Sequence, residues 1–271
     1  MGNNKKDSLG DRMKENYENR SKTYLLRRAA VIVRLDGKAF HTFTKGFKRP
    51  YDEIFHTAMN NTLKYLCENI QGCKLGYTQS DEITLLLMDD DTLTTDAFFD
   101  YNVQKVCSIT ASMATLKFNQ YFRTACNEFF AGKSDLDNYH TTMMCAKDKG
   151  AMFDSRCFNI PKEEIANAFI WRQQDCTRNA IQMLGQTYFS HKTLQNRSCN
   201  DIQDLLMTEK GINFNDMPTE FKRGVCCVKK EVECIDRLIG YKLDWVIDKE
   251  IPIFIQDREY ITRCIESAKN R

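Results

Sequence analysis

Two aspartates, Asp36 and Asp81, each stand beside an apolar run in this 271-residue chain, a pattern suited to metal-assisted phosphate chemistry. Asp36 ends the run 30–35 and is followed by Gly37, where the backbone can turn sharply and bring its carbonyl close to the metal. Paired carboxylates bind hard divalent cations, which in turn hold a triphosphate. We therefore expect Asp36, Asp81 and the Gly37 carbonyl to be metal ligands, with Glu82 the neighbour best placed to assist.

The elements around these residues predict that the two aspartates meet. The run 30–35 is β-branched and nearly continuous, which is typical of a buried strand. The stretches 73–77 and 83–88 flank a polar turn and predict a hairpin. If these strands lie side by side, Asp36 and Asp81 come together at one edge of a sheet. Each half alone has a simpler explanation, because Asp-Gly is a common turn dipeptide and Ser-Asp-Glu is commonly a solvated loop.

Two longer strings carry a family resemblance. Arg-Leu-Asp-Gly-x-x-Phe-His (34–41) and Gly-Tyr-x-Gln-Ser-Asp-Glu (76–82) resemble motifs of the tRNA-His guanylyltransferase superfamily. The resemblance is most specific over residues 24–88 and continues across most of the chain. The resemblance implies a polymerase that extends RNA in the 3′-to-5′ direction, with tRNA and nucleoside triphosphates as substrates. It further implies two bound Mg²⁺ ions and a homotetrameric assembly. It also implies that Glu82 is catalytic.

Nucleotide contacts are expected around both strings. A glycine-adjacent turn can present its amides to phosphate, so the backbone of 38–41 is expected to cradle the triphosphate, and Ser80 to donate to a phosphate oxygen. The resemblance places Arg49 and Asp52 near the activating nucleotide. His41 either lies near the nucleotide or stacks in the core, and Arg34 either caps the site or forms a surface ion pair. The expected nucleotide-binding residues are Lys38, Ala39, Phe40, His41, Arg49, Asp52 and Ser80.

Contacts with RNA or phosphate are expected from the second half of the chain. Motif match and charge indicate Arg156, Lys222 and Arg223. The segment Trp-Arg-Gln-x-Asp-Cys (171–176) also resembles the family, whose housekeeping guanylyltransferases continue with His-Ile-Asn-Asn. This chain has Thr-Arg-Asn-Ala at 177–180 instead, which makes Arg178 and Asn179 the polar groups there. The replacement resembles the guanylyltransferase-like branch, which repairs truncated tRNA 5′ ends using a template.

Composition excludes several classes of protein. The formal charge of +2 rules out a histone-like polycation, so RNA binding requires local basic surface. No apolar segment approaches the roughly 20 residues that span a bilayer, and no membrane partner is expected. The twelve cysteines include no Cys-x-x-Cys pair and accompany only four histidines. We therefore expect reduced, mostly buried thiols rather than zinc ligands or disulfides. Acidic residues within 7–18 disfavour a mitochondrial presequence, and a cytoplasmic protein is expected.

The order of elements predicts the fold. The predicted elements follow the order of a split βαβ unit. They are strand 30–35, helix 51–69 introduced by Pro50, the hairpin, a helix over 96–121 and strand 152–160. This order predicts an α+β fold with a ferredoxin-like antiparallel sheet covered by helices, and the resemblance adds that it is similar to a polymerase palm. Residues 122–150 are expected to be an irregular insertion, and Asp89 to Asp91 solvated capping surface.

We expect a palm-like catalytic core at 1–160, and at 161–271 a helical and strand region that completes the same globular unit. Within that region the patterns predict a helix from Pro161 to about 188 and a helical stretch over 190–206 with a cap at Ser198 or Asn200. They also predict a strand that follows the basic turn 221–224. Residues 243–247 and 253–255 are expected to be strand pieces, followed by a short tail.

The predicted activity is ATP-dependent activation of a tRNA 5′ end, followed by template-dependent 3′-to-5′ nucleotide addition. Three alternatives stay open from the sequence. A dedicated tRNA-His guanylyltransferase would use the same core. A palm-type nucleotide cyclase is disfavoured because its glycine-rich acidic signature is missing, and a non-catalytic RNA-binding relative because both metal carboxylates are present.

Overall fold

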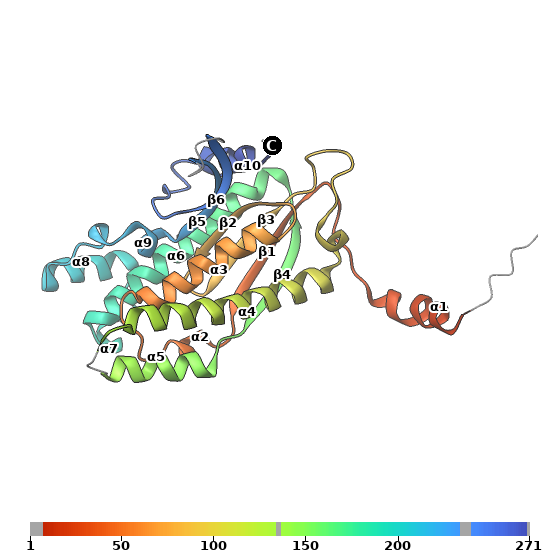
Figure 1. Ribbon diagram of the computed structural model, residues 1–271. Coiled ribbons are helices and arrows are strands. Elements are labelled where there is room, and N and C mark those ends of the chain that lie inside the picture. The colour runs from red at the N-terminus through yellow and green to blue at the C-terminus, as the bar shows by residue number, and fades with distance from the viewer. Residues whose placement is uncertain (1–7, 134–136, 234–239, 270–271) are drawn as a thin grey trace, which may run out of the picture.

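An antiparallel six-stranded sheet in the order β4-β1-β3-β2-β5-β6 forms the centre of the structure (Figure 1). The structure is a computed structural model, and it describes residues 8–133, 137–233 and 240–269. The first four strands have the ferredoxin-like order that the sequence predicts, which confirms the α+β fold. The last two come from the C-terminal third and extend the same sheet through the pairing of β5 with β2. The strands are β1 (Ala30–Gly37), β2 (Cys73–Gln79), β3 (Glu82–Leu87), β4 (Phe153–Ile160), β5 (Val225–Glu233) and β6 (Tyr241–Asp248).

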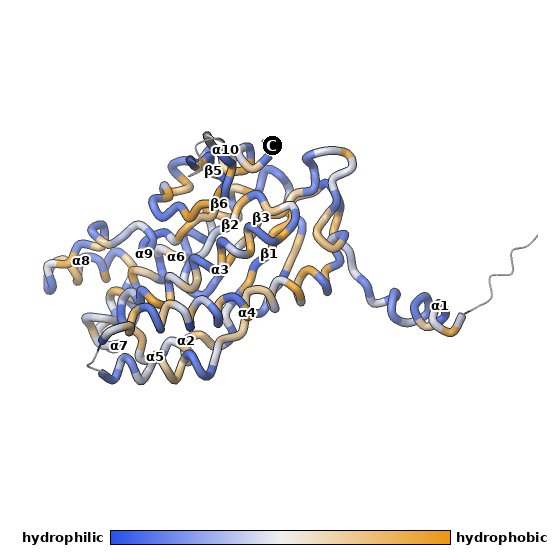
Figure 2. Tube along the Cα trace, in the orientation of Figure 1, coloured by the Kyte–Doolittle hydropathy of each residue, from blue (hydrophilic) through white to orange (hydrophobic). Residues whose placement is uncertain are grey.

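Helices cover both faces of the sheet, and this explains the continuous apolar sequence of β1. Val31, Val33 and Leu35 pack beneath α3 (Glu53–Asn69) and α4 (Val103–Phe130). Alternate residues, including Ile32, pack beneath α6 (Ile165–Tyr188) and α10 (Glu259–Lys269). Figure 2 shows polar and apolar residues alternating along these helices, as expected when one side of a helix faces the sheet.

Shorter helices surround this core. α5 (Asn138–Lys149) lies along α4, and α7 to α9 lie near one end of α6, while α1 stands away from the body on an extended segment (Figure 1). The remaining helical segments are α1 (Leu9–Met13), a π-helix (Lys14–Glu18), α2 (Phe40–Phe43), α7 (His191–Leu194), α8 (Cys199–Lys210), α9 (Thr219–Arg223), and 3₁₀ turns at Asn19–Ser21, Phe98–Tyr101, Lys162–Glu164 and Phe214–Asp216.

Five predicted elements are wrong in their bounds or type. α3 begins at Glu53 with Asp52 as its cap, two residues after the expected start at Tyr51. α4 begins only after its Asn102 cap, because Phe99 to Tyr101 have left-handed backbones that interrupt a helix. It then runs on to Phe130, so the expected irregular insertion is the end of α4 followed by α5. Residues 253–255 are not a strand, and the expected tail contains α10.

The acidic run 89–91 is only in part the solvated surface that the sequence predicts, because Asp90 is exposed but Asp89 is buried. Asp89 is 1% exposed and its carboxylate lies 2.6 Å from Arg27 Nε. Asp91 lies 2.7 Å from the buried Lys74 ammonium, and Asp90 lies 2.8 Å from Lys269. The three carboxylates therefore fasten the N-terminal segment, β2 and α10 to the end of β3.

The described cysteines are all free thiols, and seven of the eleven are buried, in agreement with the predicted burial. Within the described residues, no helix combines the length and apolar character needed to cross a membrane.

Candidate functional site

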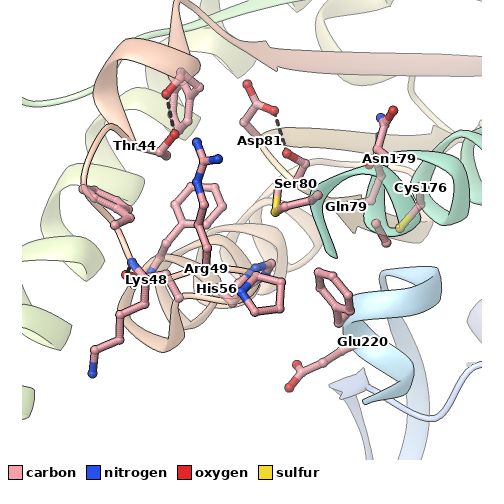
Figure 3. A pocket seen from close by; sticks show the side chains of 18 of the residues that line it. Thr44, Lys48, Arg49, His56, Gln79, Ser80, Asp81, Cys176, Asn179 and Glu220 are labelled. Atoms are coloured by element: carbon pink, nitrogen blue, oxygen red, sulfur yellow. Dashed lines mark hydrogen bonds between the residues drawn. The ribbon is translucent and has the colours of Figure 1, made fainter. Parts of the chain in front are cut away.

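A cavity of about 480 Å³ opens at one end of the sheet (Figure 3). Its walls come from α2 and the loop that follows, the start of α3, the β2–β3 turn, α6 and α9. Phenylalanines and Met183 supply apolar surface on several sides. The polar and charged side chains at the cavity include His41, Lys48, Arg49, His56, Ser80, Asp81, Asn179 and Glu220.

The structure brings Asp36 and Asp81 to the same edge of the sheet. Asp36 lies near the end of β1, directly opposite Glu82 of β3, and Asp81 precedes Glu82 in the turn. Ser80 has a left-handed backbone (φ 49°) and its hydroxyl donates to Asp81 Oδ1 over 3.0 Å. Figure 3 shows Asp81 at the edge of the cavity. The hairpin therefore delivers Asp81 to the site by a tight two-residue turn.

Electrostatics at this edge favour a cation. Burial raises the pKa of Asp81, hydrogen bonds from its own backbone amide and Ser80 oppose that rise, and the nearby charge of Asp36 adds to it. Within the described residues, no cluster of three or more His, Cys, Asp or Glu side chains forms a complete metal site. Two carboxylates with a backbone carbonyl nevertheless fit Mg²⁺, which commonly takes one or two carboxylates and completes its shell with substrate phosphates and water.

Glu82 is committed to an ion pair that sequence reasoning missed. Its Oε1 accepts from Arg172 Nε of α6 over 2.6 Å, and both side chains are nearly buried. Arg172 also donates to Asp175 over 2.7 Å. Burial raises the pKa of Glu82 even though Arg172 favours its ionised form. Glu82 thus faces α6, and the signal for its partner was the arginine of the Trp-Arg-Gln string.

The segment 38–41 has fewer backbone amides available for a phosphate than expected. The Lys38 amide is used, because it donates to the Met152 carbonyl over 2.8 Å. Ala39 has a left-handed backbone and precedes α2, and the Phe40 ring is largely buried in the core, although Phe40 also lines the cavity. His41 is exposed at the cavity, where its Nε2 lies 3.1 Å from the Thr42 hydroxyl.

Asp52 holds the loop that carries Arg49. Its carboxylate is 4% exposed and accepts from the Phe55 amide over 3.1 Å, the Lys48 amide over 2.9 Å and the Tyr139 hydroxyl over 2.9 Å. Because three donors from three segments converge on it, Asp52 shapes the cavity wall. Arg49 extends from that loop toward the Asp81 side of the cavity (Figure 3).

The expected RNA-binding residues are not gathered at this cavity. Arg156 lies 2.8 Å from Asp154 and 3.9 Å from Asp36, and so borders the metal edge. Arg178 bonds to Asp175, while Asn179 lines the cavity. Lys222 and Arg223 instead line a second cavity on another side of α6 and α9.

Sequence reasoning also missed two residues at the cavity, His56 and Glu220. The Tyr51 ring stacks on His56 at 4.0 Å with an interplanar angle of 5°. Glu220 lies 3.1 Å from Lys249 Nζ. The pKa of His56 is lowered to about 4, mainly by burial. The charge of Glu220 opposes this shift, and the charge of Lys249 adds to it. A neutral imidazole therefore faces the cavity at neutral pH. His56 follows the resemblance motifs without belonging to one, and no local signal marks it.

Comparison with known proteins agrees with this architecture. The family model for tRNAHis guanylyltransferase matches residues 10–161. A solved bacterial tRNA(His) guanylyltransferase-like protein in complex with ATP is 43% identical, with a TM-score of 0.78 over 96% of this chain and 100% of that one. A similar bacterial protein in complex with GTP is 40% identical, with a TM-score of 0.76 over 96% and 99%.

Curated relatives point the same way. A protein of Acanthamoeba polyphaga mimivirus is 31% identical over 83% of this chain and 78% of its own length. The tRNA(His) guanylyltransferase of Saccharomyces cerevisiae is 27% identical over 76% of this chain and 85% of its own length. The chain therefore belongs to the tRNA-His guanylyltransferase family, whose enzymes are nucleotidyltransferases.

Proposed function

We propose that this protein repairs tRNA 5′ ends by template-dependent nucleotide addition in the 3′-to-5′ direction. One observation carries the proposal: a nucleotide-sized cavity is lined by Asp81, which lies with Asp36 at the end of the sheet. The ATP and GTP complexes of the bacterial relatives support a triphosphate as the occupant of this cavity.

Asp36, the Gly37 carbonyl and Asp81 would hold Mg²⁺, two ions in the complete site. When bound, the metal neutralises the triphosphate and the leaving pyrophosphate. The chain's own contribution is to position the substrates. Arg49 points toward the triphosphate end, Ser80 fixes the Asp81 carboxylate, and the apolar walls exclude water from the base.

Two transfer steps then follow at one edge of the sheet. In the first, an oxygen of the tRNA 5′-phosphate attacks the α-phosphate of ATP, so that the 5′ end is adenylylated and pyrophosphate leaves. In the second, the 3′-hydroxyl of an incoming nucleoside triphosphate attacks the activated 5′-phosphate, and AMP leaves. Arg156, which lies 3.9 Å from Asp36, is placed to bind the phosphate of the RNA end.

The template dependence rests on the segment 177–180. Thr177 donates its hydroxyl to the Lys222 carbonyl over 2.9 Å, and Arg178 is bound to Asp175. Only Asn179 and Ala180 of this segment border the cavity, so few groups there can read a base. A base pair discriminates between nucleotides without a protein reader, and pairing with the opposite tRNA strand would make the choice.

The direct test uses a tRNA that lacks its 5′ nucleotide and carries a labelled 5′-monophosphate. With Mg²⁺, ATP and each nucleoside triphosphate in turn, we expect an adenylylated species that is converted to a tRNA longer by one nucleotide. Release of a cyclic nucleotide with no change in the tRNA would favour a cyclase. RNA binding without either product would favour a non-catalytic role.

A further inference from the structure

A second cavity, of about 340 Å³, is not used by the proposed reaction. It shares two walls with the first cavity, because α6 presents Cys176 and Asn179 to the first and Gln174 and Thr177 to the second. The helix α9 likewise places Phe221 at the first and Arg223 at the second. The two cavities therefore lie on different sides of the same pair of helices.

Hydrogen bonds within the protein fix the walls of this second cavity. The buried Gln173 amide donates to the Pro252 carbonyl over 2.9 Å and accepts from the Phe254 amide over 2.8 Å. Its neighbour Thr177 is bonded to the α9 backbone. Phe214 and isoleucines of α6 and the segment 253–255 supply the apolar surface. The cavity is thus held in shape without a ligand.

Three polar side chains of this cavity, Arg223, Gln174 and Asn215, are free to bind a ligand. Across residues 8–133, 137–233 and 240–269, the half-buried guanidinium of Arg223 has no hydrogen-bond or ion-pair partner, although its carbonyl accepts from Tyr77. Within the same ranges, the side-chain amides of Gln174 and Asn215 make no hydrogen bond. Lys222 adds a second cation, whose ammonium donates to the Asn215 carbonyl.

This set of groups matches one nucleotide of a polynucleotide. Amide side chains hydrogen-bond to base edges, apolar and aromatic walls accept a base face, and arginine binds a phosphate. Among the residues that the structure describes, no carboxylate lines this cavity, so they offer no metal site to help hold a triphosphate. One uncommitted guanidinium suits a single phosphodiester charge better than the four charges of a free triphosphate.

We propose that this second cavity binds one unpaired nucleotide of the RNA substrate, with its base against the Phe214 wall and its phosphate on Arg223. The inference rests on the proposed function in taking RNA as the substrate. It adds that the RNA spans α6 and α9, with its 5′ end at the first cavity and an unpaired nucleotide at the second.

Two variants and two matched controls test this. Gln174→Trp fills the cavity from its exposed rim, and Gln182→Trp places the same ring at an exposed α6 position outside both cavities. Arg223→Gln removes the free cation, and Lys192→Gln removes an exposed cation of α7. Each variant is checked for wild-type thermal unfolding, and dissociation constants are measured for ATP and for a tRNA transcript lacking its 5′ nucleotide.

We expect Gln174→Trp and Arg223→Gln each to weaken tRNA binding about tenfold, the scale of one lost stacking or phosphate contact. Arg223→Gln should also lower the salt slope of binding by about 1. ATP binding and both controls should stay within about twofold of wild type, as expected for distant or exposed positions. Unchanged tRNA binding in both variants would overturn the inference. The inference is also wrong if the wild-type protein binds two ATP molecules and either variant binds only one, because the second cavity would then bind free nucleotide.

The two proposals fail in different ways. If the wild-type protein binds tRNA through this cavity but adds no nucleotide, the inference stands and the proposed function is wrong. If nucleotides are added while the two variants bind tRNA normally, the proposed function stands and the inference is wrong.

Discussion

Arg172 of α6 donates from Nε to the Glu82 carboxylate of β3 over 2.6 Å, and so ties that helix to the sheet beside Asp36. Glu82 was expected to act on the metal or substrate. That role stays a prediction, and the nearly buried ion pair adds that Glu82 positions α6, which forms a wall of both cavities.

This ion pair should dominate the cost of mutating Glu82. Glu82→Gln leaves the buried Arg172 guanidinium with Asp175 as its remaining carboxylate partner, so the free energy of unfolding should fall by about 2 kcal/mol, the scale of a hydrogen bond between charged groups. The double variant Glu82→Gln with Arg172→Met should regain most of that loss, because it no longer buries a guanidinium that has lost one of its two partners. Urea unfolding of both variants decides the point. A double variant as unstable as the single one would argue against this explanation.

The paired aspartates should be indispensable for chemistry but not for folding. Asp36→Ala and Asp81→Ala should each reduce nucleotide addition by roughly a thousandfold or more, since each removes a charge from the metal site. Asp81→Asn should raise the free energy of unfolding without metal, because it removes an ionised group that burial and Asp36 both disfavour. Asp148→Ala, at an exposed carboxylate of α5, is the control for both assays. Near-normal addition in either alanine variant would remove these residues from the active site.

The tyrosine beneath the Arg49 loop gives a third prediction. Tyr139→Phe removes the hydroxyl that donates to Asp52 but keeps the ring, which lies 4.6 Å from the Lys48 ammonium. We expect a loss of about 1.5 kcal/mol in the free energy of unfolding, as for a hydrogen bond to a charged group. ATP should bind a few-fold more weakly because the loop is less fixed. Tyr188→Phe, at an exposed tyrosine of α6, should change neither quantity. Wild-type values for Tyr139→Phe would show that the loop does not depend on this contact.

His56 predicts a particular pH dependence of stability. Its pKa is lowered from 6.5 to about 4 by burial, so the unfolded chain binds this proton more readily than the folded one. The neutral imidazole therefore contributes fully above pH 6.5, and the contribution is lost as the pH falls through about 4. The depression corresponds to at most about 3 kcal/mol. His56→Leu should unfold with a shallower pH dependence between 7 and 4, whereas His191→Gln should keep the wild-type slope. Equal slopes in all three proteins would contradict the assignment.

Local sequence patterns predicted most of the sheet. The continuous apolar run of β1 and the hairpin of β2 and β3 were visible because their burial follows from neighbouring residues alone. The Ser198 cap of α8 was equally local, and the structure adds the reciprocal bond, in which the Asp201 carboxylate accepts from the Ser198 amide. The start of α4 was missed because it depends on the left-handed backbone at 99–101, which no glycine announces.

The same distinction between local and distant contacts applies to the site. Asp36 and Asp81 were found because each lies next to its own strand. The partners that define Glu82 and Asp52 were missed because Arg172 and Tyr139 are 90 and 87 residues away along the chain. Such contacts depend on how α6 and α5 pack, and a single sequence does not specify that packing.

The most direct test of the central claim varies the template. A set of truncated tRNAs that differ only at the base facing the missing 5′ nucleotide is offered each of the four nucleoside triphosphates with ATP and Mg²⁺. We expect each tRNA to be extended with the nucleotide complementary to its facing base, and addition across a mismatch to be poor. Addition of guanosine whatever the facing base, and only to tRNA-His, would contradict template-dependent repair and favour a dedicated guanylyltransferase.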